Sequence, residues 1–257
     1  MISILLYHQI VALTPDGDPK GLAVTPRNFE QHMAYLYHKG YHCLRLDDLV
    51  QYLHQQKSLP RKSFVITFDD GFRDLYEVVS PILNRFEFTA TIFLVAGQTG
   101  RRSNWEGQRG TAAAPLLSWK EARALVAQGF TFGSHTMTHP PLPKIDLTQA
   151  RHEIQMSRAV ISEKLGVPIK LFSYPYSQHN RPVRNLVVES GYTAACGGER
   201  GTWSMFNIWR TQCVRSDTLL SFAFKIHGLY NQYIWLREQS VLAGPLSQMR
   251  KRLKRPI

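Results

Sequence analysis

Two adjacent carboxylates, Asp69 and Asp70, follow a run of strand-forming residues at positions 63–68, and Gly71 comes directly after them. Two like charges at the end of a buried strand are costly unless a cation or a proton relieves them. Because the backbone can turn at Gly71, one carboxylate could hold a metal ion while the other faces a substrate. The simpler interpretation is that one of them caps a helix beginning near position 72, as is common for an Asp-Gly pair after a strand.

Two histidines, His135 and His139, are close enough in the sequence to bind one ion. Gly133 before them and Pro140 after them favour a loop, which differs from the helical His-Glu-x-x-His pattern of zinc proteases. A lone histidine is more often a hydrogen-bonded structural residue. Two at ligand spacing after a predicted strand instead favour a metal site.

Together with Asp70, these histidines would form a metal site with open positions for water and substrate. An ion held there lowers the pKa of its water and polarises a carbonyl group, which is the chemistry of hydrolysis. Asp69, next to the ligand Asp70, is placed to take the proton from that water. The ligand types fit Zn²⁺, and Co²⁺, Ni²⁺ or Fe²⁺ could also occupy the site.

The composition fits one α/β domain, because 257 residues with 44% hydrophobic content can form a single large core. The formal charge of +12 indicates an anionic partner, with nucleic acid, a membrane surface and an acidic polymer all admissible. Cys43, Cys196 and Cys213 show no paired metal-type spacing, so we expect reduced core residues. No apolar run has the length of a membrane span or a signal peptide, so we expect the chain to start at residue 1 in the cytoplasm.

Apolar periodicity and turn residues predict eight strands that alternate with helices. This alternation predicts a distorted parallel (β/α) barrel of seven or eight strands in one domain, residues 1–240, followed by a basic tail, residues 241–257. Thr25 and Ser118 are expected to cap helices, and Pro81 to kink or split one. The expected strands are 2–8, 43–46, 63–68, 89–95, 130–133, 171–174, 192–196 and 209–214, and the expected helices are 26–40, 47–55, 72–86, 119–129, 148–165 and 183–189.

Two further candidates lie where such a barrel places working residues. His8 is at the carboxyl end of the first expected strand. The polar loop 97–114 is long enough to be functional, and it carries Trp105. That side chain could stack on a substrate, or it could pin the loop to the body of the protein.

Residues 67–71, 135–139 and 174–176, in this order and at these separations, resemble the first three motifs of the polysaccharide deacetylases, also called NodB-homology or carbohydrate esterase family 4 enzymes. The resemblance runs from position 4 to about position 214. It implies metal-dependent removal of acetyl groups from N-acetylated sugars. By the same resemblance Asp69 is the general base, Asp70, His135 and His139 are metal ligands, and the backbone N–H of Tyr176 helps to hold the oxyanion.

One departure from the family pattern concerns the third motif. The family has an arginine two residues before Pro175, and this chain has Ser173 there. The group that orients the basic aspartate must then come from elsewhere, and Arg210 is a candidate, although a surface or structural role is equally open. We also place Trp105, Pro175 and Arg210 among the residues expected to bind the substrate.

The second departure concerns the general acid, because the late Leu-x-His motif of the family is not evident. His227 follows an isoleucine inside an apparent helix, where a packed or surface histidine is the more common case. The opening residues 5–8 resemble the start of the poly-N-acetylglucosamine deacetylase branch, in which this strand and its histidine stand at the front. We therefore expect His8 to be the acid.

The function expected from these features is hydrolysis of N-acetyl groups on a polysaccharide or its precursor, which could be lipid-linked. An O-acetyl ester or a small-molecule amide is an alternative substrate, and a non-catalytic barrel that binds an anionic polymer is the rival from another class. No nucleic-acid motif accompanies the charge, so we expect no nucleic-acid partner. The basic residues 250–255, after an amphipathic region at 219–236, could contact an anionic membrane, or they could form a solvated end. The sequence leaves the oligomeric state open.

Overall fold

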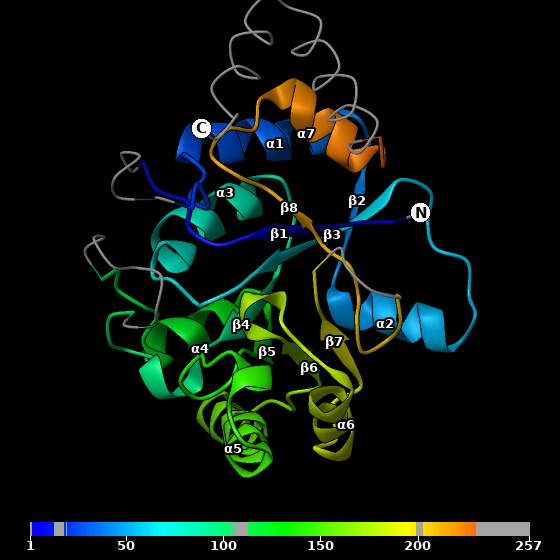
Figure 1. Cartoon of the computed structure of the whole chain (residues 1–257). Coiled ribbons are helices and arrows are strands. Elements are labelled where there is room, and N and C mark those ends of the chain that lie inside the picture. Colours follow the sequence, from blue (N-terminus) through cyan, green and yellow to red (C-terminus); the bar gives the residue numbers. More distant parts are fainter. Residues whose placement is uncertain are drawn as a thin grey trace, which may run out of the picture.

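Parallel strands form one curled sheet surrounded by helices (Figure 1) in the computed structural model, which describes residues 2–12, 18, 20–103, 105, 113–198 and 203–229. This arrangement confirms the predicted distorted parallel (β/α) barrel. Within the described part of the chain the sheet has eight strands: β1 (Ser3–Tyr7), β2 (His42–Leu44), β3 (Ser63–Phe68), β4 (Thr91–Leu94), β5 (Thr131–Ser134), β6 (Leu171–Ser173), β7 (Ala194–Cys196) and β8 (Thr211–Gln212).

The strand order is β7-β6-β5-β4-β3-β1-β8, with β2 paired to β3 outside this path. β1 pairs with β3 along its whole length, so β2 and β4 must share the opposite edge of β3. β2 pairs with residues 63–65 of β3, and β4 pairs with residues 67–68 of the same strand. A parallel β-bridge between Cys196, the last residue of β7, and Ile208, just before β8, links the two ends of this strand order. The barrel is therefore distorted by a strand that forks away from it.

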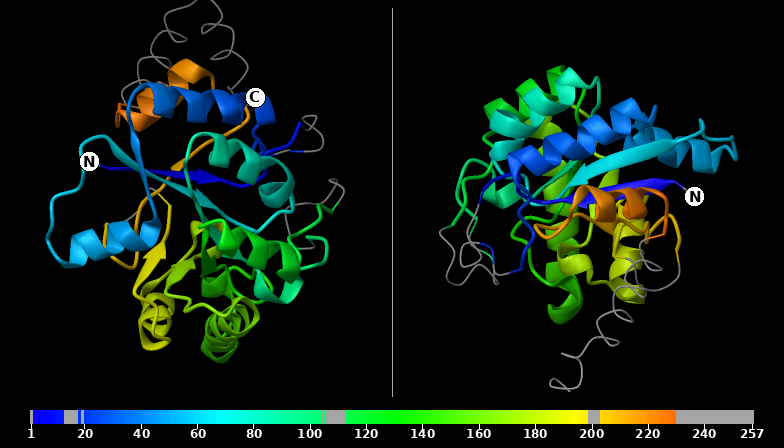
Figure 2. Two further views of the ribbon diagram at one scale, coloured as in Figure 1. Left: turned by 180° about the vertical axis from the view of Figure 1, so that it is seen from behind. Right: turned by 90° about the horizontal axis from the view of Figure 1, so that it is seen from above.

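Helices cover the outside of the curled sheet, and two groups of them lie on opposite sides of it (Figures 1 and 2). α1 contacts α7 in one group, and α5 contacts both α4 and α6 in the other. The helices are α1 (Pro26–His38), α2 (Leu46–His54), α3 (Ser80–Arg85), α4 (Trp119–Ala127), α5 (Leu147–Leu165), α6 (Arg181–Glu189) and α7 (Leu219–Ile226), with short turns η1 (Leu75–Val79), η2 (Ala96–Gln98), η3 (Leu142–Lys144) and η4 (Pro175–Ser177).

The central strand β3 is buried at every position, which explains its continuous run of apolar residues. Tyr7, Phe29 and Phe68 pack against one another on one of its faces, with ring centroids 5.2–5.9 Å apart. Such pairs add to the hydrophobic stabilisation of the core. This packing fixes the carboxyl end of β3, from which Asp69 and Asp70 emerge.

The predicted helix signals are confirmed where they can be compared with the structure. The Thr25 hydroxyl accepts the N–H of Asn28, 3.2 Å away, at the start of α1. Ser118 and Glu121 form the expected capping box of α4. Near Pro81, where a kink or split was expected, the helix changes type without interruption: η1, of π-helical type, ends at Val79 and α3 begins at Ser80, with helical backbone angles at both residues.

Several expected elements differ in length or cannot be compared. β8 has two residues where 209–214 were expected, and β7 begins at Ala194 instead of 192. α7 ends at Ile226, and residues 230–236 of the amphipathic region at 219–236, together with the tail 241–257, lie outside the described residues. Among the described helices none combines the length and the apolar character needed to cross a membrane.

The three cysteines are free thiols, as expected. Cys196 and Cys213 are buried and Cys43 is half-buried. Burial raises the pKa of each thiol to about 12. A thiol with such a pKa is neutral at physiological pH and is a poor nucleophile or metal ligand, so these residues belong to the core.

Candidate active site

Asp70, His135 and His139 meet at the carboxyl ends of β3 and β5, as the sequence predicted. The Nε2 atoms of the two histidines are 3.2 Å apart, and Asp70 Oδ1 lies 3.6 Å from His135 Nε2 and 3.4 Å from His139 Nε2. All three side chains are buried. The site is therefore an enclosed cluster of one carboxylate and two imidazoles.

The spacing of these ligand atoms fits a small divalent cation. Zinc bonds to nitrogen and oxygen of about 2.0–2.2 Å in a tetrahedral site place neighbouring ligand atoms about 3.3–3.6 Å apart. Asp70 Oδ1 is buried and has no hydrogen-bond partner among the described residues. A buried carboxylate oxygen without a partner is costly, and a cation at this position would satisfy it.

Hydrogen bonding and ring contacts orient the two imidazoles. His135 Nδ1 is 2.7 Å from the main-chain oxygen of Ser173, so Nδ1 carries the proton and Nε2 presents a lone pair to Asp70. The His139 ring lies between two aromatic rings, with centroid distances of 4.8 Å to Trp105 and 4.6 Å to Tyr176. Both histidines thus turn a ligand nitrogen toward the same point.

Burial disfavours the charged form of each of the three residues in the cluster. Burial, and then the charge of Asp69, raise the pKa of Asp70 well above its usual range. Burial also lowers the pKa of His135, and burial together with His135 lowers that of His139. Neutral imidazoles are the form that binds metal. A cation would also compensate the carboxylate charge that the site otherwise disfavours.

The second carboxylate, Asp69, is held by Arg210 in a two-point ion pair. Arg210 Nη1 donates to Asp69 Oδ1 and Nη2 to Asp69 Oδ2, both at 2.7 Å. Ser173 Oγ donates to Asp69 Oδ2 at 3.1 Å and accepts from Arg210 Nη2 at 2.9 Å. Burial alone would raise the pKa of Asp69, but the Arg210 charge holds it well below its usual range.

Arg210 is therefore not placed to contact a substrate. Its side chain has 0% exposure and its guanidinium lies over the Phe93 ring, 5.5 Å from the centroid. The expectation that Arg210 binds the substrate is wrong, because this buried side chain is directed to Asp69. The alternative expectation matches the geometry: Arg210 supplies from the start of β8 the guanidinium that Ser173 cannot supply from β6.

The capping interpretation of the two carboxylates is also wrong. Asp70 and Gly71 both have positive φ values, 73° and 72°, so the chain turns sharply instead of entering a helix. Asp74, not either carboxylate, precedes the first helical turn, η1. The cost of a left-handed aspartate is about 1 kcal/mol and is accepted here at the metal-ligand position.

His8 and Asp69 leave the adjacent ends of the paired strands β1 and β3, where the Asp69 N–H donates to the Tyr7 carbonyl at 3.1 Å. Burial lowers the pKa of His8 to about 4, while the charge of Asp69 acts in the opposite direction. His8 Nδ1 is buried without a hydrogen-bond partner in the described part of the chain. The structure thus brings His8 to the site as a neutral imidazole.

His227, the other histidine considered for the general acid, lies away from this site. His227 caps the carboxyl end of α7, where its ring nitrogens lie 3.3 Å from the Tyr35 hydroxyl and 3.5 Å from the Tyr41 hydroxyl. It is exposed and does not contact the metal-ligand cluster. This agrees with the expectation of a surface histidine.

The remaining predicted residues surround His139. Trp105 is 9% exposed and packs on Phe72 as well as on His139, so this side chain is held against the body of the protein. Pro175 is buried at the start of η4, and Tyr176 follows it with a φ of 58°. The Tyr176 ring lies against His139, and the left-handed backbone at Tyr176 is a strained conformation.

Two residues at the site were missed by the sequence analysis. The ammonium group of Lys20 lies 5.5 Å from the centroid of the Tyr176 ring, and its charge acts on both Asp70 and His139. Glu153 of α5 contacts the loop between the two histidines. Neither has a local sequence signal, because a lone lysine in a loop and a lone glutamate on a helix are usual surface residues.

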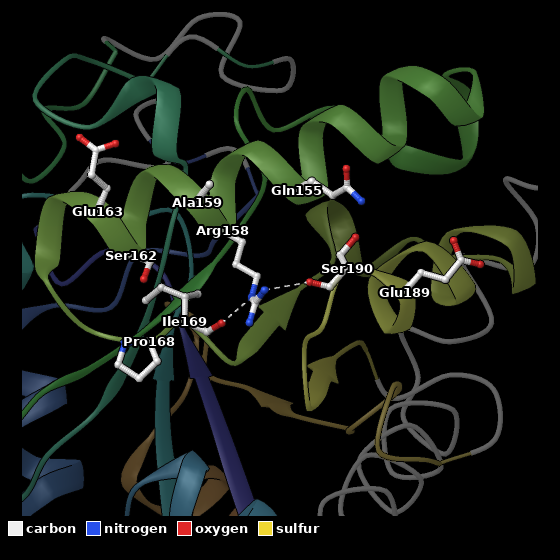
Figure 3. Close-up of a pocket in the computed structure, with 9 residues that line it drawn as sticks. All are labelled: Gln155, Arg158, Ala159, Ser162, Glu163, Pro168, Ile169, Glu189 and Ser190. Carbon is white, nitrogen blue, oxygen red and sulfur yellow. Dashed lines mark hydrogen bonds between the residues drawn. The ribbon is translucent and has the colours of Figure 1, made fainter.

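A pocket of about 590 Å³ lies away from this cluster, between α5 and α6 (Figure 3). Arg158 reaches into it and donates to the main-chain oxygens of Ile169, at 2.9 Å, and Ser190, at 3.1 Å. These contacts join α5 to the segments around it. The pocket contains none of the predicted site residues, and its arginine has a structural role.

Comparison with known proteins agrees with this geometry. The family model for polysaccharide deacetylase matches residues 56–195. YxkH of Bacillus subtilis (strain 168), a protein named after this family, is 26% identical over 203 residues, which cover 79% of this chain and 66% of YxkH. Poly-beta-1,6-N-acetyl-D-glucosamine N-deacetylase of Staphylococcus epidermidis is 26% identical over 197 residues, covering 72% of this chain and 65% of the relative. The chain thus spans just under two thirds of these curated relatives.

Solved structures show the same fold. The deacetylase PplD of Streptococcus pyogenes superimposes with a TM-score of 0.76 at 23% identity, over 88% of this chain and 97% of PplD. IcaB of Ammonifex degensii gives a TM-score of 0.71 at 22% identity, over 89% of this chain and 96% of IcaB. The family match covers more than half of the chain and contains the acidic pair and both histidines. The chain belongs to the polysaccharide deacetylase family.

Proposed function

We propose that this protein is a metal-dependent hydrolase that removes N-acetyl groups from a polysaccharide or from its precursor. The observation that carries the proposal is the convergence of Asp70, His135 and His139 within ligand distance of one point, with the ionised Asp69 beside them. Two neighbouring carboxylates with opposite pKa changes support separate roles for them. Asp70 suits cation binding and Asp69 suits proton transfer.

Asp70, His135 and His139 would hold the cation, and Zn²⁺ is the ion that best fits one carboxylate and two imidazoles. Co²⁺, Ni²⁺ or Fe²⁺ could bind to the same residues. When bound, the cation supplies Lewis acidity that polarises the acetyl carbonyl and makes water more acidic. The two neutral imidazoles and the buried Asp70 carboxylate would be its ligands.

Asp69 accepts the proton that the attacking water loses. It is ionised at neutral pH, and Arg210 and Ser173 hold both of its oxygens in one orientation. The ion pair makes Asp69 a weak base in the resting protein, so its proton uptake would require water that a bound cation has made more acidic. Arg210 acts through Asp69 as a positioning residue.

His8 delivers the proton that the leaving nitrogen needs when the amide C–N bond breaks. Its buried Nδ1 without a partner and its place beside Asp69 support this role. Because the pKa of His8 is about 4, it is neutral at rest and must gain a proton during the cycle. The proton taken up by Asp69 is the source, so water and amide become acetate and a protonated amine. The Tyr176 main chain would support the oxyanion.

N-acetylated saccharide is the substrate class that the family supports, and the relative from Staphylococcus epidermidis is named for poly-beta-1,6-N-acetyl-D-glucosamine. We extend this class to the present chain and include a lipid-linked precursor. Trp105, which packs on His139, and Pro175, which precedes Tyr176 in η4, are the proposed substrate contacts. A cytoplasmic location at the inner face of a membrane would suit such a precursor. Nucleic acid has no part in the proposal.

Metal-stripped protein, supplied in turn with Zn²⁺, Co²⁺, Ni²⁺ or Fe²⁺, tests the proposal when acetate and free amine are measured together. We expect both products in equal amounts from N-acetylglucosamine oligomers. The matched substrates are an O-acetyl ester and a small N-acetyl amide. Turnover of only those compounds would transfer the activity to another substrate class, and polymer binding without turnover would contradict the enzyme proposal.

A further inference from the structure

We propose that Glu153 of α5 is a positioning residue that holds His139 in place for the cation. This inference rests on the proposed metal site and names a residue outside its ligand set. The carboxylate of Glu153 lies under the loop that connects His135 to His139. Its effect on chemistry would pass through the second histidine.

Three donors from two consecutive loop residues converge on Glu153. Oε2 accepts the N–H of Met137 at 2.8 Å and the N–H of Thr138 at 2.9 Å, and Oε1 accepts the Thr138 hydroxyl at 2.7 Å. Hydrogen bonds to an ionised acceptor are roughly twice as strong as neutral ones. Among the described residues Glu153 forms no ion pair with a lysine or arginine, so its contacts are directed to this loop.

The loop has a conformation that needs such support. Thr136 has a φ of 71° and His139 a φ of 67°, which are left-handed values that side chains with a Cβ disfavour. Each costs about 1 kcal/mol or more, and the branched Thr136 has a particularly high cost. Local bonds help, since Ser134 Oγ accepts from Thr136 N–H and Thr136 Oγ1 accepts from His139 N–H. They do not attach the centre of the loop to the body.

The loop between His135 and His139 is attached to the rest of the protein on two sides. On one side the N–H groups of Ala96 and Gly97 donate to the carbonyls of Thr136 and Met137, at 3.0 and 2.9 Å. On the other side Glu153 takes the N–H groups of the loop. The loop carbonyls and loop N–H groups are thus held by separate elements, η2 and α5.

The two histidines depend on the loop to different degrees. His135 directly follows β5, its N–H bonds to the Leu94 carbonyl at 2.8 Å, and its ring is held by Ser173. Among the described residues the backbone of His139 forms no hydrogen bond with a strand, and His139 reaches the cluster through the strained turn. Loss of Glu153 should therefore displace His139 and leave His135 in place.

The experiment measures Zn²⁺ affinity of the full chain by competition with a chromogenic chelator. Wild type is compared with Glu153→Ala, Glu153→Gln and the control Glu163→Gln, a 72% exposed carboxylate on the same helix. Residues that support metal ligands change affinity by about 10–100-fold. We expect a loss of that size for Glu153→Ala and a smaller loss for Glu153→Gln, whose amide oxygen still accepts the two N–H groups. The control should match wild type.

A second readout separates ligand placement from general stability. The visible spectrum of the Co²⁺-loaded protein should change in Glu153→Ala, because a displaced imidazole alters the ligand field, while circular dichroism shows a folded chain. If Glu153→Ala does not fold, Glu153→Gln decides: affinity and spectrum equal to the control would overturn the inference. Equal Zn²⁺ affinity in Glu153→Ala and wild type would also overturn it. Failure of wild type to bind Zn²⁺ at all would instead contradict the proposed function.

Discussion

Asp69 and Asp70 are neighbours in the sequence with opposite surroundings. Asp69 contacts Arg210 and Ser173, whereas Asp70 faces two imidazoles and lacks a hydrogen-bond partner on Oδ1 among the described residues. The left-handed turn at Asp70 separates the two side chains. A difference in neighbours alone therefore makes one carboxylate a stable anion and the other a group that needs a cation.

Replacement of Arg210 by methionine should destabilise the metal-free protein by about 3–5 kcal/mol, because the buried Asp69 charge loses its partner. Urea unfolding measures this change. The double variant Arg210→Met with Asp69→Asn should recover part of the loss, since the second substitution removes the uncompensated charge. A double variant less stable than Arg210→Met would show that the ion pair is not the cause.

Replacement of His139 by alanine removes one of the three proposed ligands. We expect Zn²⁺ affinity to fall at least about 100-fold, because even residues that only support ligands change it by 10–100-fold. Zinc content after dialysis against a chelator measures the effect. His152→Ala is the matched control, as His152 is an exposed histidine on α5. Unchanged zinc in His139→Ala would place the metal elsewhere.

The residues of the site differ in how far sequence could predict them. Asp70, His135 and His139 carry a spacing and a strand-end position that indicate a metal site. The role of Arg210 could not be derived in the same way, because it depends on β8 lying beside β1, which in turn lies beside β3. Glu153 was missed for a similar reason, since only the packing of α5 under a loop gives it a role.

At the scale of elements, α1 and α7 enclose a buried histidine. The His32 ring stacks on Phe222 of α7 at a centroid distance of 4.0 Å, and its Nδ1 lies 3.1 Å from the Tyr7 hydroxyl. Burial lowers the pKa of His32 to about 4; the charge of Asp217 has a smaller effect in the opposite direction, and that of Lys225 a smaller effect in the same direction. Packing of these helices therefore requires a neutral imidazole.

This requirement predicts a pH-dependent stability. The pKa of His32 is about 4 when folded and near 6.5 when unfolded, so its contribution is complete above pH 6.5 and is lost as pH falls toward 4. Between pH 7 and 4.5 the loss should be roughly 2–3 kcal/mol for this residue. His32→Gln should show a smaller fall in unfolding free energy over this range. His38→Gln, at an exposed position of α1, should behave as wild type; an equal fall in all three proteins would exclude His32 as the source.

The elements themselves were largely predictable because their signals are local. Capping at Thr25 and Ser118, the change of helix type just before Pro81 and the buried run of β3 each depend on a few adjacent residues. The fork of β2 and β4 on one edge of β3, and the short β8, depend on pairing between distant segments. Periodicity carries no information about such pairing.

At the scale of the whole molecule, the net charge of +12 includes five basic residues within positions 250–255. We propose that this end brings the enzyme to an anionic membrane, where each lysine or arginine contributes about 1 kcal/mol at low salt. Co-sedimentation with anionic liposomes should decrease on deletion of residues 250–257 and on addition of salt. If deletion changes neither binding nor its salt dependence, the end is a passive, solvated segment, and location at a membrane loses its support.

The central claim is that an ionised Asp69 acts on water at a cation held by Asp70, His135 and His139. Asp69→Asn keeps the shape of the side chain and removes the proton acceptor. The decisive measurement is acetate release from N-acetylglucosamine oligomers per bound zinc, in wild type and in this variant. We predict release by wild type and a fall of about 100-fold or more in Asp69→Asn at an unchanged zinc content. Equal release per zinc from both proteins would contradict the account.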